Sequence, residues 1–194
     1  GKKNINIFVL HPHNMISSVQ RQLMTTYKAN NVFNLAIKGS FDDCQKIVKD
    51  MFVDQSFTKK INMSGVNSIN WARIIAQIVY YFFIYYKFTD HQKPIVVSVP
   101  TGNFGDIYAG YVAKKMGLNI KELIVATNQN NILQRCIVSG EYNPTKVVQS
   151  ISPSMDIQVA SNFERILFYL CEESSEDLSI LMLSLIHISE PTRQ

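Results

Sequence analysis

Cysteine is scarce in this sequence and is not arranged for chemistry. The chain has 194 residues and three cysteines, Cys44, Cys136 and Cys171, which lie far apart and form no Cys-x-x-Cys pair. No Cys/His spacing of the kind that binds zinc occurs, and the two histidines beside Pro12 have no third ligand nearby. Isolated thiols in odd number are typical of a reducing compartment. We therefore expect a cytoplasmic protein without a metal site.

An excess of charge of one sign is also lacking. Nineteen basic and fifteen acidic side chains give a formal net charge of +4. The Lys and Arg residues form no block and no clustered face, which argues against nucleic acid as a partner.

No hydrophobic run in the chain is typical of a membrane span. Residues 69–87 are almost entirely apolar, but Arg73 and Gln77 interrupt them. A central Arg costs about 2.5–3.5 kcal/mol on insertion into a bilayer. The apolar run at 178–188 is too short to span a bilayer. We expect residues 69–87 to form a helix that Asn67 or Ser68 caps and that is buried between a sheet and other helices.

Apolar residues make up 46% of the chain and charged residues 18%, which is typical of a compact α/β protein. The hydrophobic pattern predicts strands at 5–10, 32–37, 95–99 and 122–126. It predicts helices at about 18–27, 41–52, 69–87 and 107–116. A strand, a helix and a second strand in succession predict a parallel sheet with flanking helices.

The junction between strand 95–99 and helix 107–116 is the most informative segment. Residues 100–106 read P-T-G-N-F-G-D. In parallel α/β sheets, anions bind where a strand ends in a glycine-bearing turn and a helix N-terminus follows. The backbone N–H groups of Gly102, Asn103, Phe104 and Gly105 are the expected phosphate donors. The alternative is a tight turn with no ligand.

Several collinear segments resemble the threonine synthases. They are G-S-F-D-D-C-Q-K-I-V-K at 39–49, V-N-S-I-N-W-A-R-I-I-A-Q-I-V-Y-Y-F at 66–82, S-V-P-T-G-N-F-G-D-I-Y-A-G-Y-V-A-K-K-M-G-L at 98–118, V-A-T-N-Q-N-N-I-L at 125–133 and S-P-S-M-D-I at 152–157. The resemblance implies a fold-type-II enzyme whose cofactor is pyridoxal phosphate. It also implies a carbon–oxygen lyase that converts O-phosphohomoserine and water to threonine and phosphate.

The resemblance also assigns residues. Gly102, Asn103, Phe104 and Asp106 match the stretch that binds pyridoxal phosphate in this family. Because a carboxylate cannot face a phosphate favourably, we expect Asp106 to cap or orient a neighbouring loop. The lysine that forms the Schiff base in this family lies upstream, so no catalytic residue is assigned here.

A second set of polar residues, Asn67, Ser68, Asn70 and Arg73, surrounds the predicted N-terminus of the long helix. These residues are candidates for binding the substrate phosphate or carboxylate. The alternative is a helix cap followed by a buried, paired Arg73.

We expect residues 1–170 to be a partial catalytic region and 171–194 to be a non-native or divergent tail, because the resemblance stops near Cys171. The chain starts at Gly1 and is expected to be an internal fragment that is inactive alone. Two alternatives remain open: another fold-type-II lyase acting on serine or threonine, and an inactive remnant without cofactor.

Overall fold

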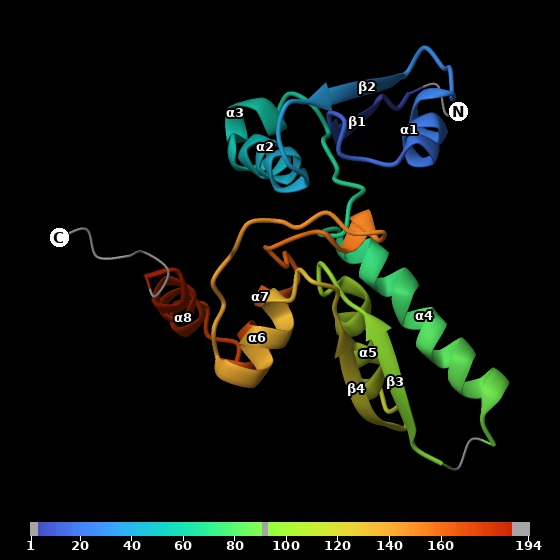
Figure 1. Cartoon of the computed structure of the whole chain (residues 1–194), viewed down its shortest axis with the longest axis vertical. Coiled ribbons are helices and arrows are strands. Elements are labelled where there is room, and N and C mark those ends of the chain that lie inside the picture. The colour runs from blue at the N-terminus through green and yellow to red at the C-terminus, as the bar shows by residue number, and fades with distance from the viewer. Residues whose placement is uncertain (1–3, 91–92, 188–194) are drawn as a thin grey trace. The chain divides into compact units, whose positions relative to one another are not determined.

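The computed structural model describes residues 4–90 and 93–187, and it divides into two compact units, residues 1–64 and 65–194 (Figure 1). Each unit contains one pair of parallel strands with helices beside it. The predicted fold class, parallel strands with flanking helices, is therefore confirmed for both units.

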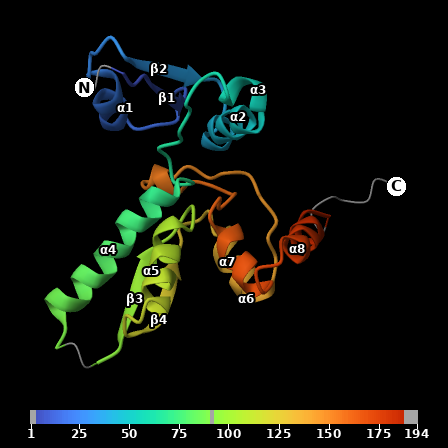
Figure 2. The same ribbon diagram turned by 180° about the vertical axis from the view of Figure 1, so that it is seen from behind.

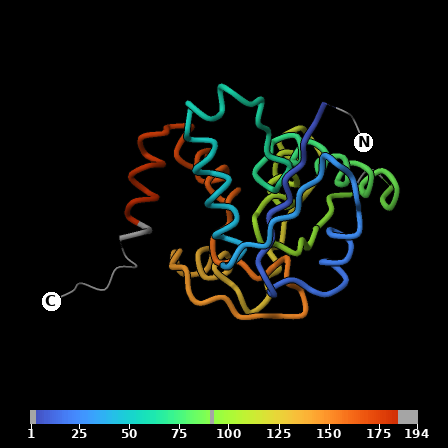
Figure 3. The backbone as a smooth tube through the Cα atoms, turned by 90° about the horizontal axis from the view of Figure 1, so that it is seen from above, coloured from blue at the N-terminus to red at the C-terminus, as the bar shows by residue number. Residues whose placement is uncertain are grey.

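The first unit is built on strands β1 (Ile7–Pro12) and β2 (Val32–Ile37), which pair in parallel from Ile7↔Val32 to Pro12↔Ile37. Figure 3 shows these two strands running side by side. The chain between and after them forms α1 (Ser18–Thr25), α2 (Phe41–Val53) and the short α3 (Gln55–Thr58). The predicted strand 5–10 ended too early, since β1 also includes His11 and Pro12, whose pairing with β2 continues to Ile37.

Side-chain caps fix where the helices of this unit begin. Ser17 accepts a hydrogen bond from the Gln20 N–H at the start of α1. Ser40 and Asp43 form a reciprocal capping box at the start of α2, in which each side chain accepts from the other residue's backbone N–H.

The second unit is a βαβ unit packed against a long helix. Strands β3 (Ile95–Pro100) and β4 (Ile120–Ala126) are parallel and flank α5 (Gly105–Lys115) in sequence. Helix α5 lies between the strand pair and α4 (Trp71–Phe88), as Figure 2 shows from behind. Gly117, with φ +102°, ends α5 in the left-handed conformation that favours glycine.

The remaining elements complete this unit. They are α6 (Ile132–Ser139), a 3₁₀ turn at Pro153–Met155, α7 (Phe163–Leu170) and α8 (Ser175–His187). Leu178, Leu181 and Met182 of α8 are partly buried and pack against the core of the unit. The division of the chain at residue 170 stays a prediction.

Only one face of α4 is buried. Ile74, Ile78, Tyr81 and Tyr85 lie on that face and join the core with α5 and the strands. The other face exposes large side chains, among them Tyr80 and Phe83. The expectation that this helix is buried between a sheet and other helices is therefore met on one face only, and within the described residues of the second unit the other face is exposed. Within the described residues, no helix is long and apolar enough to cross a membrane.

The contact between α4 and α5 depends on a glycine. A Cβ atom built on Gly110 would lie 2.6 Å from Cε1 of Tyr81 and 3.0 Å from Cδ2 of Leu123. Gly110 therefore allows α5 to approach α4 and β4 together. The Tyr81 hydroxyl then reaches the backbone carbonyl of Asp106 and donates to it over 2.8 Å.

We expect Gly110→Ala to lower the stability of the full-length protein by about 1–3 kcal/mol, because added volume in a packed core forces backbone shifts. This loss outweighs the helix preference of Ala over Gly, which is about 1 kcal/mol. Thermal unfolding of the two proteins measures the difference. An unchanged or raised midpoint would show that the helices separate without cost.

Candidate functional site

The candidate site begins where β3 ends. The Thr101 N–H donates to the carbonyl of Ala126 at the end of β4, over 2.7 Å, and the Thr101 hydroxyl donates to the carbonyl of Val99, over 2.6 Å. The side chain is buried, with 3% of its surface exposed. These bonds attach the start of the loop 101–105 firmly to both strands.

The loop then presents free backbone donors. Helix α5 begins at Gly105, and its N-cap residue, Phe104, has no side chain able to accept a hydrogen bond. Within the described residues, no acceptor pairs with the backbone N–H groups of residues 102–106. N–H groups that converge at a helix start favour an anion. The loop therefore has the donor chemistry that a phosphate group requires.

Both loop glycines allow close packing. A Cβ atom on Gly102 would lie 3.4 Å from Cα of Met155, and one on Gly105 would lie 3.3 Å from Nδ2 of Asn162. The left-handed residue of the loop is Phe104, with φ 62°, and not either glycine. The space around Gly105, rather than its own backbone conformation, therefore disfavours a larger side chain there.

Asn103 joins the two sets of residues that the sequence suggested separately. Its side-chain Nδ2 donates to the hydroxyl of Ser68, which lies just before α4, over 2.8 Å. Its Oδ1 accepts a long bond of 3.4 Å from the Ser161 N–H. The structure thus brings Ser68 to the phosphate-type loop, across 35 positions of sequence.

The start of α4 differs from the expectation. Asn70 is the N-cap, because its Oδ1 accepts from the Ala72 N–H over 2.9 Å, and its Nδ2 donates to the Gly65 carbonyl. Asn67 lies three residues earlier, and its Oδ1 accepts a hydrogen bond from the Ile69 N–H over 3.2 Å, which forms a turn before the helix. The prediction that Asn67 or Ser68 caps the helix is therefore wrong. Arg73 is exposed, so the alternative of a buried, paired Arg73 is also wrong.

Asp106 is the second residue of α5, and its carboxyl group lies next to the loop in sequence. Burial raises its pKa above the ordinary value, and the Tyr81 hydroxyl and the Arg73 charge oppose this rise without cancelling it. Burial also raises the pKa of Tyr81, whose hydroxyl therefore stays protonated. The Tyr81 hydroxyl donates to the backbone carbonyl of Asp106 and also interacts with its carboxyl group, so Asp106 ties the start of α5 to α4.

Two functional candidates were missed by the sequence analysis. Asn162 precedes α7, is fully buried, and contacts both Asn103 and Ser68. Arg165 bonds to Asn162 and to the carbonyl of Ile69. An Asn before an amphipathic helix is the signal of an ordinary N-cap, and nothing in the sequence shows that this one is buried.

A knot of hydrogen bonds around Asp156 lies in the segment that contacts the loop at Gly102. The carboxylate accepts from Asn128 Nδ2 (2.8 Å), Asn130 Nδ2 (3.0 Å), and the hydroxyl and N–H of Ser150 (2.7 and 2.8 Å). Burial alone would raise the pKa of Asp156, but these bonds together outweigh it and lower the pKa. The knot fixes the segment 150–157, against which Gly102 packs.

Comparison with known proteins agrees with this geometry. No protein-family model matches the chain. It is 54% identical over 167 residues to threonine synthase of Pseudomonas aeruginosa, covering 86% of this chain and 36% of the relative. It is 51% identical over 176 residues to threonine synthase of Saccharomyces cerevisiae, covering 89% of this chain and 34% of the relative.

Solved structures agree as well. A structure described as PLP-bound threonine synthase from Brucella melitensis superposes with a TM-score of 0.83 at 48% identity, covering 100% of this chain and 42% of that one. Threonine synthase from Escherichia coli superposes with a TM-score of 0.80 at 36% identity, covering 86% of this chain and 40% of that one.

The parallel strand pair and the glycine-bearing loop at a helix N-terminus define a segment of an α/β protein with an anion-type site. The chain belongs to the threonine synthase family. It spans little more than a third of the length of the curated relatives described above.

We expect Asp156→Asn to destabilise the full-length protein by about 1–3 kcal/mol at pH 7, because an amide cannot accept from all of these donors. The folded-state pKa is lowered, so the ionised group stabilises the fold above its unfolded pKa of about 3.9. That contribution is lost as pH falls through the folded pKa.

The difference between variant and wild type should therefore shrink below about pH 4, and urea unfolding from pH 7 to pH 3 measures it. Asp90→Asn, at an exposed surface pair, is the control and should change little at any pH. A difference that is equal at both ends of this range would contradict the role of the carboxylate charge.

Proposed function

We propose that this segment supplies the cofactor-phosphate site and part of the substrate site of a threonine synthase. The reaction is the conversion of O-phosphohomoserine and water to threonine and phosphate. The observation that supports this most directly is the row of N–H groups at residues 102–106, which have no acceptor among the residues that the structure describes, in a chain 54% identical to a threonine synthase. A structural relative is described as PLP-bound, and pyridoxal phosphate is the cofactor we propose.

The donor set fits the phosphate of that cofactor. Gly102, Asn103, Phe104 and Gly105 offer backbone N–H groups, which bind a phosphate without adding a side-chain charge. Asp106 follows them in sequence, and its raised pKa lowers the cost of keeping it uncharged near an anion. Pyridoxal phosphate, when bound, supplies the ring that accepts electrons during elimination.

The residues before α4 are proposed to bind the substrate. Ser68 accepts a hydrogen bond from Asn103 and keeps its own hydroxyl hydrogen to donate. Arg73 is exposed one turn into the helix and offers a fork of N–H groups to a phosphate or carboxylate. Asn67 and Asn70 already accept backbone bonds at the helix start, so we propose that they hold Ser68 and Arg73 in place.

The location of the enzyme and its partners follow from the same proposal. O-phosphohomoserine is the proposed small-molecule partner, and neither a membrane nor nucleic acid takes part. We propose that the enzyme acts in the cytoplasm.

The proposed function is tested with the full-length protein that contains this segment. We expect phosphate release from O-phosphohomoserine, and no comparable turnover of serine or threonine. The isolated 194-residue chain should release no phosphate, because the family's Schiff-base lysine lies outside it. Preference for serine or threonine would favour the alternative lyase, and release of phosphate by the isolated chain would contradict the fragment prediction.

In the full-length protein, we expect Gly105→Val to weaken cofactor binding by about two to four orders of magnitude. A branched side chain there would meet Asn162, Ile74 and Gln77, and would displace the N–H groups from the phosphate. Each lost charge-assisted hydrogen bond removes about 1.5–3 kcal/mol, and two losses give this range.

Asn103→Ala is the matched variant and should act more mildly, because its backbone N–H survives. Absorbance titration with pyridoxal phosphate measures both. Affinity close to wild type for Gly105→Val would show that the turn is only structural.

A further inference from the structure

Asn162 occupies the N-cap position of α7 but does not cap that helix. Its side chain accepts no hydrogen bond from a backbone N–H group of the first turn of α7, and Asn162 has none of its surface exposed. Instead, Nδ2 donates to the carbonyls of Ser68 (2.8 Å) and Asn103 (3.1 Å), and the backbone N–H donates to the Asn103 carbonyl as well (3.1 Å). Asn162 is therefore bonded to both segments of the proposed site.

The Asn103 carbonyl and the Phe104 N–H belong to one planar peptide group. In a trans peptide, the C=O and the following N–H point in opposite directions, and the barrier to rotation is about 18–20 kcal/mol. Two donors of Asn162 hold the oxygen of this group. The Phe104 N–H is thereby directed away from Asn162.

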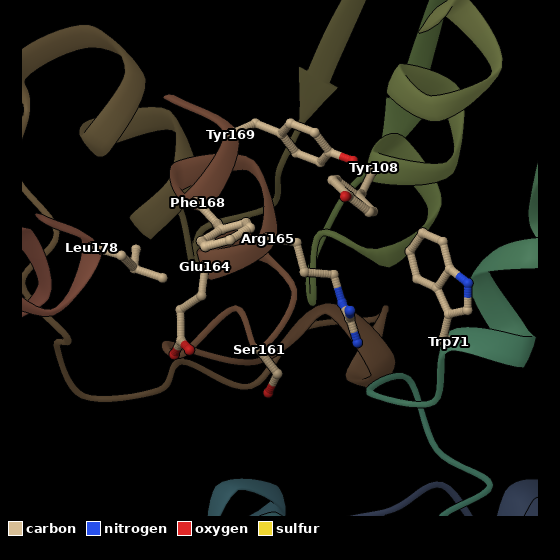
Figure 4. Close-up of a pocket in the computed structure, with 8 residues that line it drawn as sticks. All are labelled: Trp71, Tyr108, Ser161, Glu164, Arg165, Phe168, Tyr169 and Leu178. Atoms are coloured by element: carbon tan, nitrogen blue, oxygen red, sulfur yellow. The ribbon is translucent and has the colours of Figure 1, made fainter. Parts of the chain in front are cut away.

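The orientation of the Asn162 amide is set by Arg165. The Arg165 Nε–H donates to Asn162 Oδ1 over 2.9 Å, and because Arg has donors only, this side of the amide must be the oxygen. The nitrogen then faces the two carbonyls. Arg165 is itself held by the carbonyl of Ile69 (2.8 Å) and by the ring of Trp71, whose centroid lies 5.4 Å away. Figure 4 shows Arg165 extending from α7 toward Trp71.

Phe104 needs such support. A bulky residue at φ 62° costs about 1–3 kcal/mol and persists only where its surroundings impose it. Asn162 holds the peptide before Phe104, and Phe163 packs edge-on against its ring, with centroids 5.1 Å apart. Asn162, just before α7, thus fixes the backbone of Phe104, and Phe163, the first residue of α7, fixes its side chain.

We propose that Asn162 is a positioning residue that directs the Phe104 N–H toward the cofactor phosphate, and that Arg165 orients its amide for this task. This inference rests on the proposed function. In this proposal, Asn162 and Arg165 raise the affinity for the phosphate group of the cofactor and do not affect the binding of its ring.

The test compares two ligands, pyridoxal phosphate and pyridoxal, which differ only in the phosphate. In the full-length protein, Asn162→Asp keeps an oxygen for Arg165 but replaces the donor by a second oxygen, which repels both carbonyls. We expect its dissociation constant for pyridoxal phosphate to rise about ten- to hundredfold, the loss of one to two hydrogen bonds. Its affinity for pyridoxal should stay within about twofold of wild type.

The matched control is Gln158→Glu, the same amide-to-acid change at a side chain 4% exposed that bonds to Asn130 and Thr145 rather than to the loop. It should lower stability without changing the preference for the phosphorylated ligand. Arg165→Lys leaves Asn162 in place, and should also reduce that preference, because a single ammonium group cannot replace the fork that orients the amide. Thermal unfolding without ligand reports the folding of each variant.

Each outcome decides the inference. If Asn162→Asp and Arg165→Lys weaken both ligands equally, or weaken neither, the positioning role is overturned. If Asn162→Asp does not fold, the Arg165→Lys result alone decides between these outcomes. A wild-type protein that shows no preference for pyridoxal phosphate over pyridoxal would instead contradict the proposed function.

Discussion

The carbonyl of Asn103 accepts hydrogen bonds from the backbone and the side chain of Asn162, and most of the site's geometry depends on this contact. The same side chain reaches the carbonyl of Ser68, so it connects the loop after β3 to the segment before α4. These segments lie 59 and 94 positions away from Asn162 in sequence. Contacts over such distances form only when the whole unit has folded, which makes the loop a product of the fold rather than of its own sequence.

Local chemistry predicted the elements of the chain well. Strand 32–37 was predicted with the observed bounds, and helix 41–52 was predicted to within one residue of α2. These features depend on hydrophobic period and on capping, which act within a few residues. The loop 102–105 was found for the same reason, since a strand, two glycines and a helix lie together in sequence.

The missed features share a different cause. The burial of Asn162 and the knot around Asp156 arise from segments that meet only in the folded unit. The cap of α4 is Asn70 and not Asn67. Both side chains can accept a hydrogen bond at a helix start, and the sequence alone does not show which of the two does so. The left-handed Phe104 was also not foreseeable, because two glycines nearby are the usual residues for that conformation.

The backbone carbonyl groups around this loop have hydrogen-bond partners, whereas its N–H groups do not have partners among the described residues. Carbonyls of Asn103, Phe104 and Asp106 accept bonds from Asn162, Tyr108 and Tyr81. By contrast, no described residue pairs with the N–H groups of residues 102–106.

Unpaired donors destabilise a partly buried segment, and an anion that pairs with them binds the folded form alone. Such a ligand stabilises the protein by mass action. The arrangement that we propose for a phosphate site therefore also makes the stability of the loop depend on the ligand. Gly102 packs against segment 154–157 and Gly105 against Asn162 and α4, and these contacts keep the donors in place before the ligand arrives.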